Sequence, residues 1–266
     1  MINPKCISEQ LMYLTVRLVS GNHTATGFIY ETPNKTNVII GNRHFAEKTD
    51  KPDYSKTTIK DVISLELHLK NGTNVPVYDY VDWYLHPSCD LAFFNLDDLL
   101  KKYPNSYYFL RLTSQNIPSQ STLDDLCALE DIVMVGYPDG RYDAANNYPI
   151  FRYGKTATHP AVNYNGKKIG MIDVPCLPGS SGSPVAIVNE GIYYNKNGAT
   201  TVGSRFIFLG IEVSMPCKYH DVYERDSNGE LKVTNKYYYL HDLSLGNYIK
   251  SEELRGFNSI FAALSI

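Results

Sequence analysis

Four Asn-Gly pairs divide this chain of 266 residues, and they constrain its fold more than any other feature. They lie at 71–72, 165–166, 197–198 and 228–229. Asn-Gly between two apolar segments is the strongest short-range signal for a β-hairpin, because both residues tolerate a positive φ. The segments that flank these pairs are short and rich in Val, Ile, Phe and Tyr. The sequence therefore predicts an all-β fold.

Strand-like segments follow one another closely along both halves of the chain. The clearest are 11–20, 25–30, 36–42, 64–69, 75–81, 90–96, 131–138, 168–174, 185–194 and 201–215. Such spacing is typical of β-sandwiches and β-barrels. The polar segment 112–122 is interpreted as a linker between two halves, and 97–103 as a helical turn. The segment SEELRGFNSIFAALSI has helical spacing, which predicts a C-terminal helix capped by Ser251.

Composition argues against several classes of function. The net charge is −3 and no run of Lys or Arg occurs, so nucleic acid is not expected as a partner. No apolar segment approaches the length of a membrane span, and the first residues, MINPKCISEQ, lack the pattern of a signal peptide. The five cysteines form no C-x-x-C pair and show no zinc-binding spacing. We therefore expect a cytoplasmic protein without a membrane partner or a metal.

The segment LPGSSGSPVAI, residues 177–187, contains three serines that composition does not distinguish. A catalytic serine needs a base within hydrogen-bond reach and backbone donors where the oxyanion forms. Gly179 lets the chain turn so that its own N–H points inward beside that of Ser181, and Gly182 leaves room at the nucleophile. This argument selects Ser181 as the candidate nucleophile, with the N–H groups of Gly179 and Ser181 as the oxyanion hole. The competing interpretation is an ordinary Gly/Ser-rich turn.

A base and an orienting acid are available upstream. His44 follows the apolar segment NVIIG, and Asp90 opens the apolar segment DLAFFNL. Each has a simpler interpretation as a turn or cap residue, and His86 and His159 compete with His44 as the base. The order His44, Asp90, Ser181 is nevertheless the order of one known class of catalytic triad.

Four stretches together resemble the trypsin-like (chymotrypsin-fold) serine peptidases, in the motif style of the bacterial HtrA-like and glutamyl-endopeptidase branches. TGFIY with NVIIGNRHF resembles their G-x-G-F-I-I…T-N-x-H-V segment, and HPSCDLAFFNL resembles D-P-x-x-D-I-A-V-L. DIVMVGYPDG resembles their strand ending in G-Y-P, and DVPCLPGSSGSPV resembles D-A-A-x-x-P-G-N-S-G-G/S-P. The four stretches occur in the family's order over about residues 11 to 215.

The resemblance implies two antiparallel six-stranded β-barrels with the active site between them and a C-terminal helix. The expected domains are an N-terminal barrel, 1–118, and a C-terminal barrel with the terminal helix, 119–266. His44 and Asp90 would come from the first barrel and Ser181 from the second.

The activity that the resemblance implies is that of a serine endopeptidase, which cleaves a protein or peptide through an acyl-enzyme and needs no cofactor. Ser180 stands before the nucleophile, where activated zymogens carry an Asp, so activation by N-terminal trimming is not expected. Two alternatives stay open: a catalytically silent peptidase fold that binds peptides, and a protease that an activating protein partner switches on. An esterase of the α/β-hydrolase fold is disfavoured, because G-x-S-x-G and the order Ser-Asp-His are both absent.

Specificity residues follow from the resemblance as well. In this fold the pocket for the residue before the scissile bond is walled by segments that correspond here to 174–178 and 210–215. The candidates are Pro175, Glu212, Val213 and Ser214. The glutamate-preferring relatives carry a His at the position of Glu212, so a carboxylate there would favour a basic or polar side chain. A shift of register by one residue would instead turn Glu212 towards solvent, and both alternatives stay open.

Overall fold

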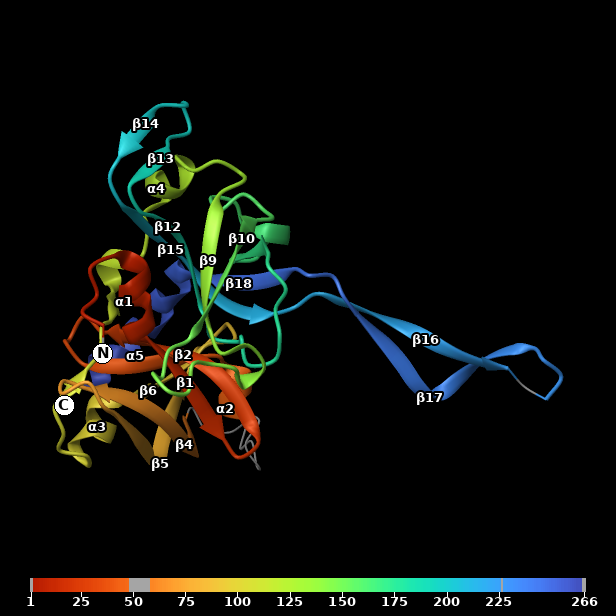
Figure 1. Ribbon diagram of the computed structural model, residues 1–266, viewed down its shortest axis with the longest axis horizontal. Helices are drawn as coiled ribbons and strands as arrows, with labels where there is room; N and C mark the ends of the chain where they lie inside the picture. Colours follow the sequence, from red (N-terminus) through yellow and green to blue (C-terminus); the bar gives the residue numbers. More distant parts are fainter. Residues whose placement is uncertain (1, 48–57, 226, 265–266) are drawn as a thin grey trace.

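The computed structural model describes residues 2–47, 58–225 and 227–264, and it consists mostly of strands. Two β-barrels form the body of the molecule, and one long hairpin projects from it (Figure 1). Among the described residues, no helix combines the length and the apolar character that a bilayer crossing requires.

The N-terminal barrel contains six antiparallel strands. They are β1 (Thr15–Ser20), β2 (His23–Glu31), β3 (Asn37–Gly41), β4 (Thr58–Leu69), β5 (Asn74–Leu85) and β6 (Ala92–Asn95). Their order is β1-β2-β3-β6-β5-β4, and a further pairing of β4 with β1 closes the barrel. The accessory elements are α1 (Ile7–Leu14), α2 (Arg43–Glu47), α3 (Leu96–Lys101), β7 (Tyr107–Tyr108) and β8 (Leu112–Thr113).

The C-terminal barrel is closed in the order β10-β11-β18-β15-β12-β9. Its strands are β9 (Asp131–Gly136), β10 (Ile150–Thr156), β11 (Ile169–Asp173), β12 (Pro184–Asn189), β15 (Arg205–Ser214) and β18 (Gly246–Lys250). Short helices lie before, between and after these strands: η1 (Ser114–Asn116), α4 (Gln120–Asp124), η2 (Pro138–Gly140), η3 (Tyr164–Gly166), η4 (Ser251–Phe257) and α5 (Asn258–Ala263). The fold class predicted from the sequence is therefore confirmed, whereas the domain division at residue 118 stays a prediction.

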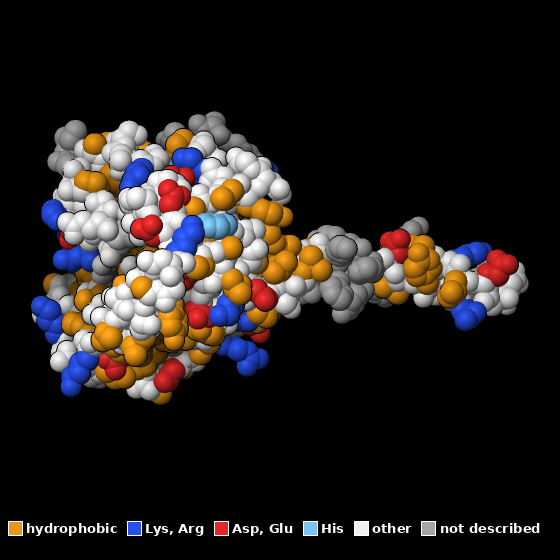
Figure 2. Space-filling model, turned by 90° about the horizontal axis from the view of Figure 1, so that it is seen from above, with side chains coloured by type: hydrophobic (Ala, Val, Ile, Leu, Met, Phe, Trp, Pro, Cys, Tyr) orange, Lys and Arg blue, Asp and Glu red, His pale blue; other side chains and the backbone are white. Residues whose placement is uncertain are grey.

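Two hairpins extend from the C-terminal barrel. One is short, β13 (Ile192–Tyr194) with β14 (Thr200–Val202), and the other is the projecting arm, β16 (Cys217–Arg225) with β17 (Leu231–Asp242). Figure 2 shows the arm standing away from the body, with hydrophobic and charged side chains along it. Its outer part exposes Tyr223, Leu231 and Val233.

Three of the four Asn-Gly pairs join paired strands, at 71–72, 197–198 and 228–229. The fourth, 165–166, belongs to the short helix η3 between β10 and β11, so it does not form a tight hairpin. The interpretation of 11–20 as one strand is wrong for its first four residues, which end α1. Ile7, Leu11 and Leu14 recur at helical spacing, and the last two are buried against the core between the barrels.

Two other local predictions need correction. The predicted linker 112–122 is not irregular, because it contains β8, η1 and the start of α4. The C-terminal segment begins as the 3-10 helix η4, and Ser251 makes no capping hydrogen bond. Ser251 is instead buried at the junction of β18 and η4.

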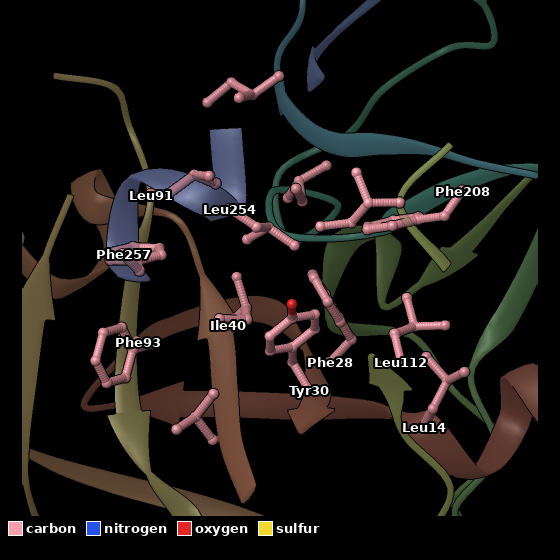
Figure 3. Packing of buried hydrophobic residues seen from close by; sticks show 14 of the residues in the cluster. Leu14, Phe28, Tyr30, Ile40, Leu91, Phe93, Leu112, Phe208, Leu254 and Phe257 are labelled. Carbon is pink, nitrogen blue, oxygen red and sulfur yellow. The ribbon is translucent and has the colours of Figure 1, made fainter. Parts of the chain in front are cut away.

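The two barrels meet across a shared apolar core. Strand alternation sends Phe28 and Tyr30 of β2 into this shared core, whereas Ile29 between them faces the interior of the N-terminal barrel. Phe257 of the C-terminal segment packs edge-on against Phe93 of β6, with ring centroids 4.9 Å apart (Figure 3). The C-terminal segment therefore fastens one barrel to the other.

Candidate active site

His44 and Asp90 meet at one end of the N-terminal barrel. Helix α2 begins directly after β3, so His44 lies in its first turn, and Asp90 lies in the loop that leads into β6. The His44 Nδ1 atom is 2.7 Å from Asp90 Oδ2, and the His44 backbone N–H donates to Asp90 Oδ1 at 2.8 Å. An ionised carboxylate only accepts hydrogen bonds, so Nδ1 carries the proton. Nε2 then keeps its lone pair and is able to act as a base.

A third side chain holds the acid in place. Asn42 Nδ2 donates to the backbone oxygen of Asp90 at 2.8 Å. About a third of each partner's side chain is exposed, 33% for His44 and 36% for Asp90, so both groups reach the surface of the cleft. Sequence reasoning did not identify Asn42, although it stands two residues before His44.

The structure separates the three serines by burial. Ser180 and Ser183 are each only 1% exposed, whereas Ser181 is partly exposed. Ser181 and His44 line one pocket of about 310 Å³. The pocket's other walls come from Asn22, His23, Thr24, Ala25, Phe45, Asp139, Gly140, Pro178 and Gly179. Of the three candidates, Ser181 is therefore the one that a ligand in this pocket can touch.

The loop before Ser181 presents two backbone donors. Gly179 has a φ of 89°, and a Cβ there would collide with the Tyr137 carbonyl oxygen. The Pro178 carbonyl accepts a hydrogen bond of 2.6 Å from the Asp139 N–H. Within the described part of the chain, the N–H groups of Gly179 and Ser181 have no acceptor. The loop therefore has the form that an oxyanion hole requires.

Thr26 holds this loop in place, and sequence reasoning missed it. Its buried hydroxyl donates to the Gly179 carbonyl at 2.8 Å and accepts from the Tyr137 N–H at 3.0 Å. Its backbone N–H donates to the Ser181 carbonyl at 2.9 Å. The one signal in the sequence is a Thr between Ala25 and Gly27 on an otherwise apolar strand.

Glu212 does not point to solvent, because it is only 2% exposed. Its backbone bonds the two residues that follow the candidate nucleophile. The Gly182 N–H donates to the Glu212 carbonyl oxygen, and the Glu212 N–H donates to the Ser183 carbonyl oxygen, each at 2.9 Å. Its carboxyl lies beside the Cys176 thiol, and Oε2 has no hydrogen-bond partner in the described structure. Burial, reinforced by the nearby Asp90 carboxylate, raises the pKa of Glu212 to about 8.

The other three candidate specificity residues are more exposed. Pro175 and Ser214 are at the surface, and Ser214 accepts a hydrogen bond of 3.2 Å from Asn247. Val213 packs partly against the core between the barrels. The pocket around Ser181 is lined neither by these three residues nor by Glu212.

The competing histidines lie elsewhere. His86 is 2% exposed, and its Nδ1 accepts from the N–H groups of Ser88 and Cys89, at 3.2 and 3.1 Å. Its Nε2 donates to the Glu253 carbonyl at 2.9 Å. His86 and Cys89 approach the Glu253 carboxylate closely enough to suggest a metal site. Backbone groups already occupy both ring nitrogens, so this set does not fit a metal ion. His159 accepts from the Ala161 N–H in the second half of the chain.

Comparison with known proteins identifies the family of the chain. No sequence among the curated proteins matches the chain. Similar solved structures include an inactive form of Rv3671c from M. tuberculosis, with 13% identity, a TM-score of 0.45 and coverage of 100% of this chain and 94% of that one. A Glu endopeptidase gives 12% identity and a TM-score of 0.43, with coverage of 94% of this chain and 91% of that one. The scabies mite inactivated protease paralogue S-I1 gives 12% identity, a TM-score of 0.47 and coverage of 96% of each chain.

The family assignment rests on the sequence and not on these distant structures. The family model for the trypsin-like peptidase domain matches residues 25–191, which is more than half of the chain. That range contains the loop of Asp90 and the segment around Ser181. The chain therefore belongs to the trypsin-like peptidase family.

Proposed function

We propose that the protein is a serine endopeptidase with the triad His44, Asp90 and Ser181. The observation that carries the proposal is the pocket in which an accessible Ser181 and a His44 oriented by Asp90 come together beside two unpaired N–H groups. A nucleophile, its base, an orienting acid and an oxyanion site are the four parts that acyl transfer requires.

The reaction follows from the position of each group. His44 Nε2 takes the proton of Ser181 Oγ as this oxygen attacks the substrate carbonyl carbon. The carbonyl oxygen becomes an oxyanion, which the N–H groups of Gly179 and Ser181 stabilise. His44 then gives the proton to the leaving amine, and the peptide C–N bond breaks. A water molecule, deprotonated by His44, attacks the ester and releases Ser181. Asp90 stabilises the imidazolium in both steps, and no step uses a cofactor.

The conformation of the loop supports activity without a prior activation step. The Pro178 carbonyl is bonded to Asp139 and the Gly179 carbonyl to Thr26, so both N–H donors are available in the chain as described.

The absence of disulfides among Cys6, Cys89, Cys127, Cys176 and Cys217 is consistent with the cytoplasmic location that the sequence predicts.

The substrate is a protein or peptide, and we place Glu212 in the pocket for the residue before the scissile bond. The support is its backbone contact with Gly182 and Ser183, the two residues that follow Ser181, and its unpartnered Oε2. A basic side chain that reaches Glu212 would ionise the carboxyl and pair with it, whereas an acidic one would add a second buried negative charge. We therefore expect faster cleavage after Lys than after Leu or Glu.

Substitution of Ser181 by Ala tests the triad. Loss of a triad nucleophile lowers kcat by a factor on the order of a million in related mechanisms, whereas the fold keeps all its packing. Ser180→Ala and Ser183→Ala serve as matched controls, because they remove the same atom from the same loop. Full turnover by Ser181→Ala together with loss of turnover in either control would contradict the assignment. A peptide that binds Ser181→Ala and the wild type equally without cleavage by either would favour the silent binding module.

Peptides that differ only in Lys, Leu or Glu before the scissile bond test the specificity proposal. The preference for Lys should disappear in Glu212→Gln, since the amide cannot ionise. An unchanged ranking in this variant, or fastest cleavage after Glu in the wild type, would remove Glu212 from the specificity argument.

A further inference from the structure

A second, smaller pocket lies on the C-terminal barrel, away from the residues that line the active-site pocket. It has a volume of about 100 Å³, and we call it the barrel pocket. Its apolar wall includes Pro118, Leu123 and Leu209, and its polar wall includes Tyr248, Lys250 and Arg255. Lys250 is the last residue of β18, and Arg255 follows in η4.

The Lys250 side chain is largely buried and forms no ion pair with a described carboxylate. Its neighbour Ile249 packs into the core between the barrels, so strand alternation turns Lys250 towards the opposite face. Lys250 is only 5% exposed, and no described carboxylate forms an ion pair with it. The nearest acid in sequence, Glu252, lies 3.7 Å from Lys168 instead. Desolvation lowers the pKa of Lys250, and the Glu252 carboxylate opposes this shift only in part. The charge of the amine is therefore not fully compensated by the protein.

Two further donor groups belong to residues that line the same pocket. The Tyr248 hydroxyl is buried, and it has no hydrogen-bond partner in the described structure. Arg255, which is exposed, makes no ion pair with any described residue. Burying a hydroxyl or a charge without a partner is costly, so such groups are ordinarily matched by a ligand, an ion or water. The barrel pocket thus combines two cations and an unused hydroxyl with one carboxylate, Glu252, that is engaged elsewhere.

We propose that the barrel pocket binds a small oxyanion, which Lys250 and Arg255 hold as an ion pair while the Tyr248 hydroxyl donates to it. The volume suits an ion of the size of acetate or phosphate and is too small for a peptide. A carboxylate and a phosphate share the chemistry that these donors recognise.

The pocket also adjoins the strand that carries Glu212. In the pairing of β15 with β18, Lys250 lies opposite Gly210, and Tyr248 lies opposite Glu212. An anion that fixes Lys250 and Tyr248 therefore stabilises the part of the barrel on which the segment behind the nucleophile rests. Because the anion binds the native state, it raises the melting temperature by mass action.

Thermal unfolding of the full chain tests the site, with sodium acetate, sodium phosphate and sodium chloride compared at equal ionic strength. In the wild type we expect a saturable rise in Tm of about 5 °C with one of the two oxyanions and none with chloride. Whether acetate or phosphate acts identifies the source of the anion. Lys250→Met should lose the rise, and Lys167→Met, at an exposed lysine that lies outside the barrel pocket, should keep it. Without added anion, Lys250→Met should be at least as stable as the wild type, because it removes a buried, unpaired charge.

Two outcomes would overturn the proposal. One is a rise of equal size in the wild type and Lys250→Met, which would place the anion elsewhere. The other is the absence of a saturable rise in the wild type with either oxyanion. Tyr248→Phe provides a second route should Lys250→Met not fold. It removes a single oxygen and should weaken the apparent affinity for the anion, whereas an unchanged affinity would exclude the hydroxyl from the site.

Discussion

Replacing Glu212 by Gln should change how the stability of the protein depends on pH. The Glu212 carboxyl is 2% exposed, its Oε2 is unpartnered, and its pKa in the folded state is raised from 4.5 to about 8. The folded protein thus retains a proton between these two values that the unfolded chain has lost. Because the folded state then binds more protons than the unfolded state, the free energy of unfolding falls as the pH rises through this window.

The size of the effect follows from the two pKa values. With 4.5 for the unfolded and about 8 for the folded state, linkage gives a loss of about 2 kcal/mol between pH 6 and pH 8 for this group alone. Gln has nearly the same shape and does not titrate. Any cost of burying its amide is independent of pH, so it shifts the whole curve without changing its slope.

Urea unfolding of the wild type and Glu212→Gln at several pH values from 6 to 8 provides the measurement. The difference in free energy of unfolding between the two proteins should move by about 2 kcal/mol in favour of the variant as the pH rises. Glu224→Gln, an exposed position on the projecting arm, should follow the wild type throughout. Parallel curves for the wild type and Glu212→Gln would refute the reasoning, because they would mean that the carboxyl ionises near its ordinary pKa.

Two further substitutions test the supports of the site. Thr26→Val removes the hydroxyl between the Gly179 carbonyl and the Tyr137 N–H. Urea unfolding should show a loss of stability of about 2 kcal/mol, and peptide kinetics should show a larger change in kcat than in KM. Thr26→Ser keeps the hydroxyl, so it should retain the stability and the kcat of the wild type. His86→Ala leaves a cavity and two unpaired N–H groups in the loop before Asp90, so calorimetry should show a loss of about 3 kcal/mol; a loss below about 1 kcal/mol would count against this role.

The sequence was informative where several weak signals had to agree. His44, Asp90 and the serine loop are each ambiguous alone, but their order and their flanking strands selected a set whose members the structure brings to one cleft. Their catalytic roles stay predictions. The Asn-Gly turns predicted three of the hairpins because that dipeptide fixes a local backbone geometry.

Other features depend on tertiary contacts that no local pattern reveals. Thr26 looks like any strand residue until the loop of Gly179 folds onto it. The side of the strand that Glu212 faces depends on pairing irregularities between Val185 and Ala186 and between Glu212 and Ser214, and sequence alternation does not show these. The run LMYL, residues 11–14, fits either a strand or a helix. It forms the end of α1, in which Leu11 and Leu14 pack into the core between the barrels.

Labelling of the intact wild-type chain with a fluorophosphonate, followed by mapping of the modified residue by mass spectrometry, tests the central claim most directly. The reagent reacts with a serine only when a base and an oxyanion hole activate it. The account predicts a single adduct on Ser181 without prior cleavage of the chain, and its loss in His44→Ala. An adduct on Ser180 or Ser183, or no adduct on a folded wild-type chain, would contradict it.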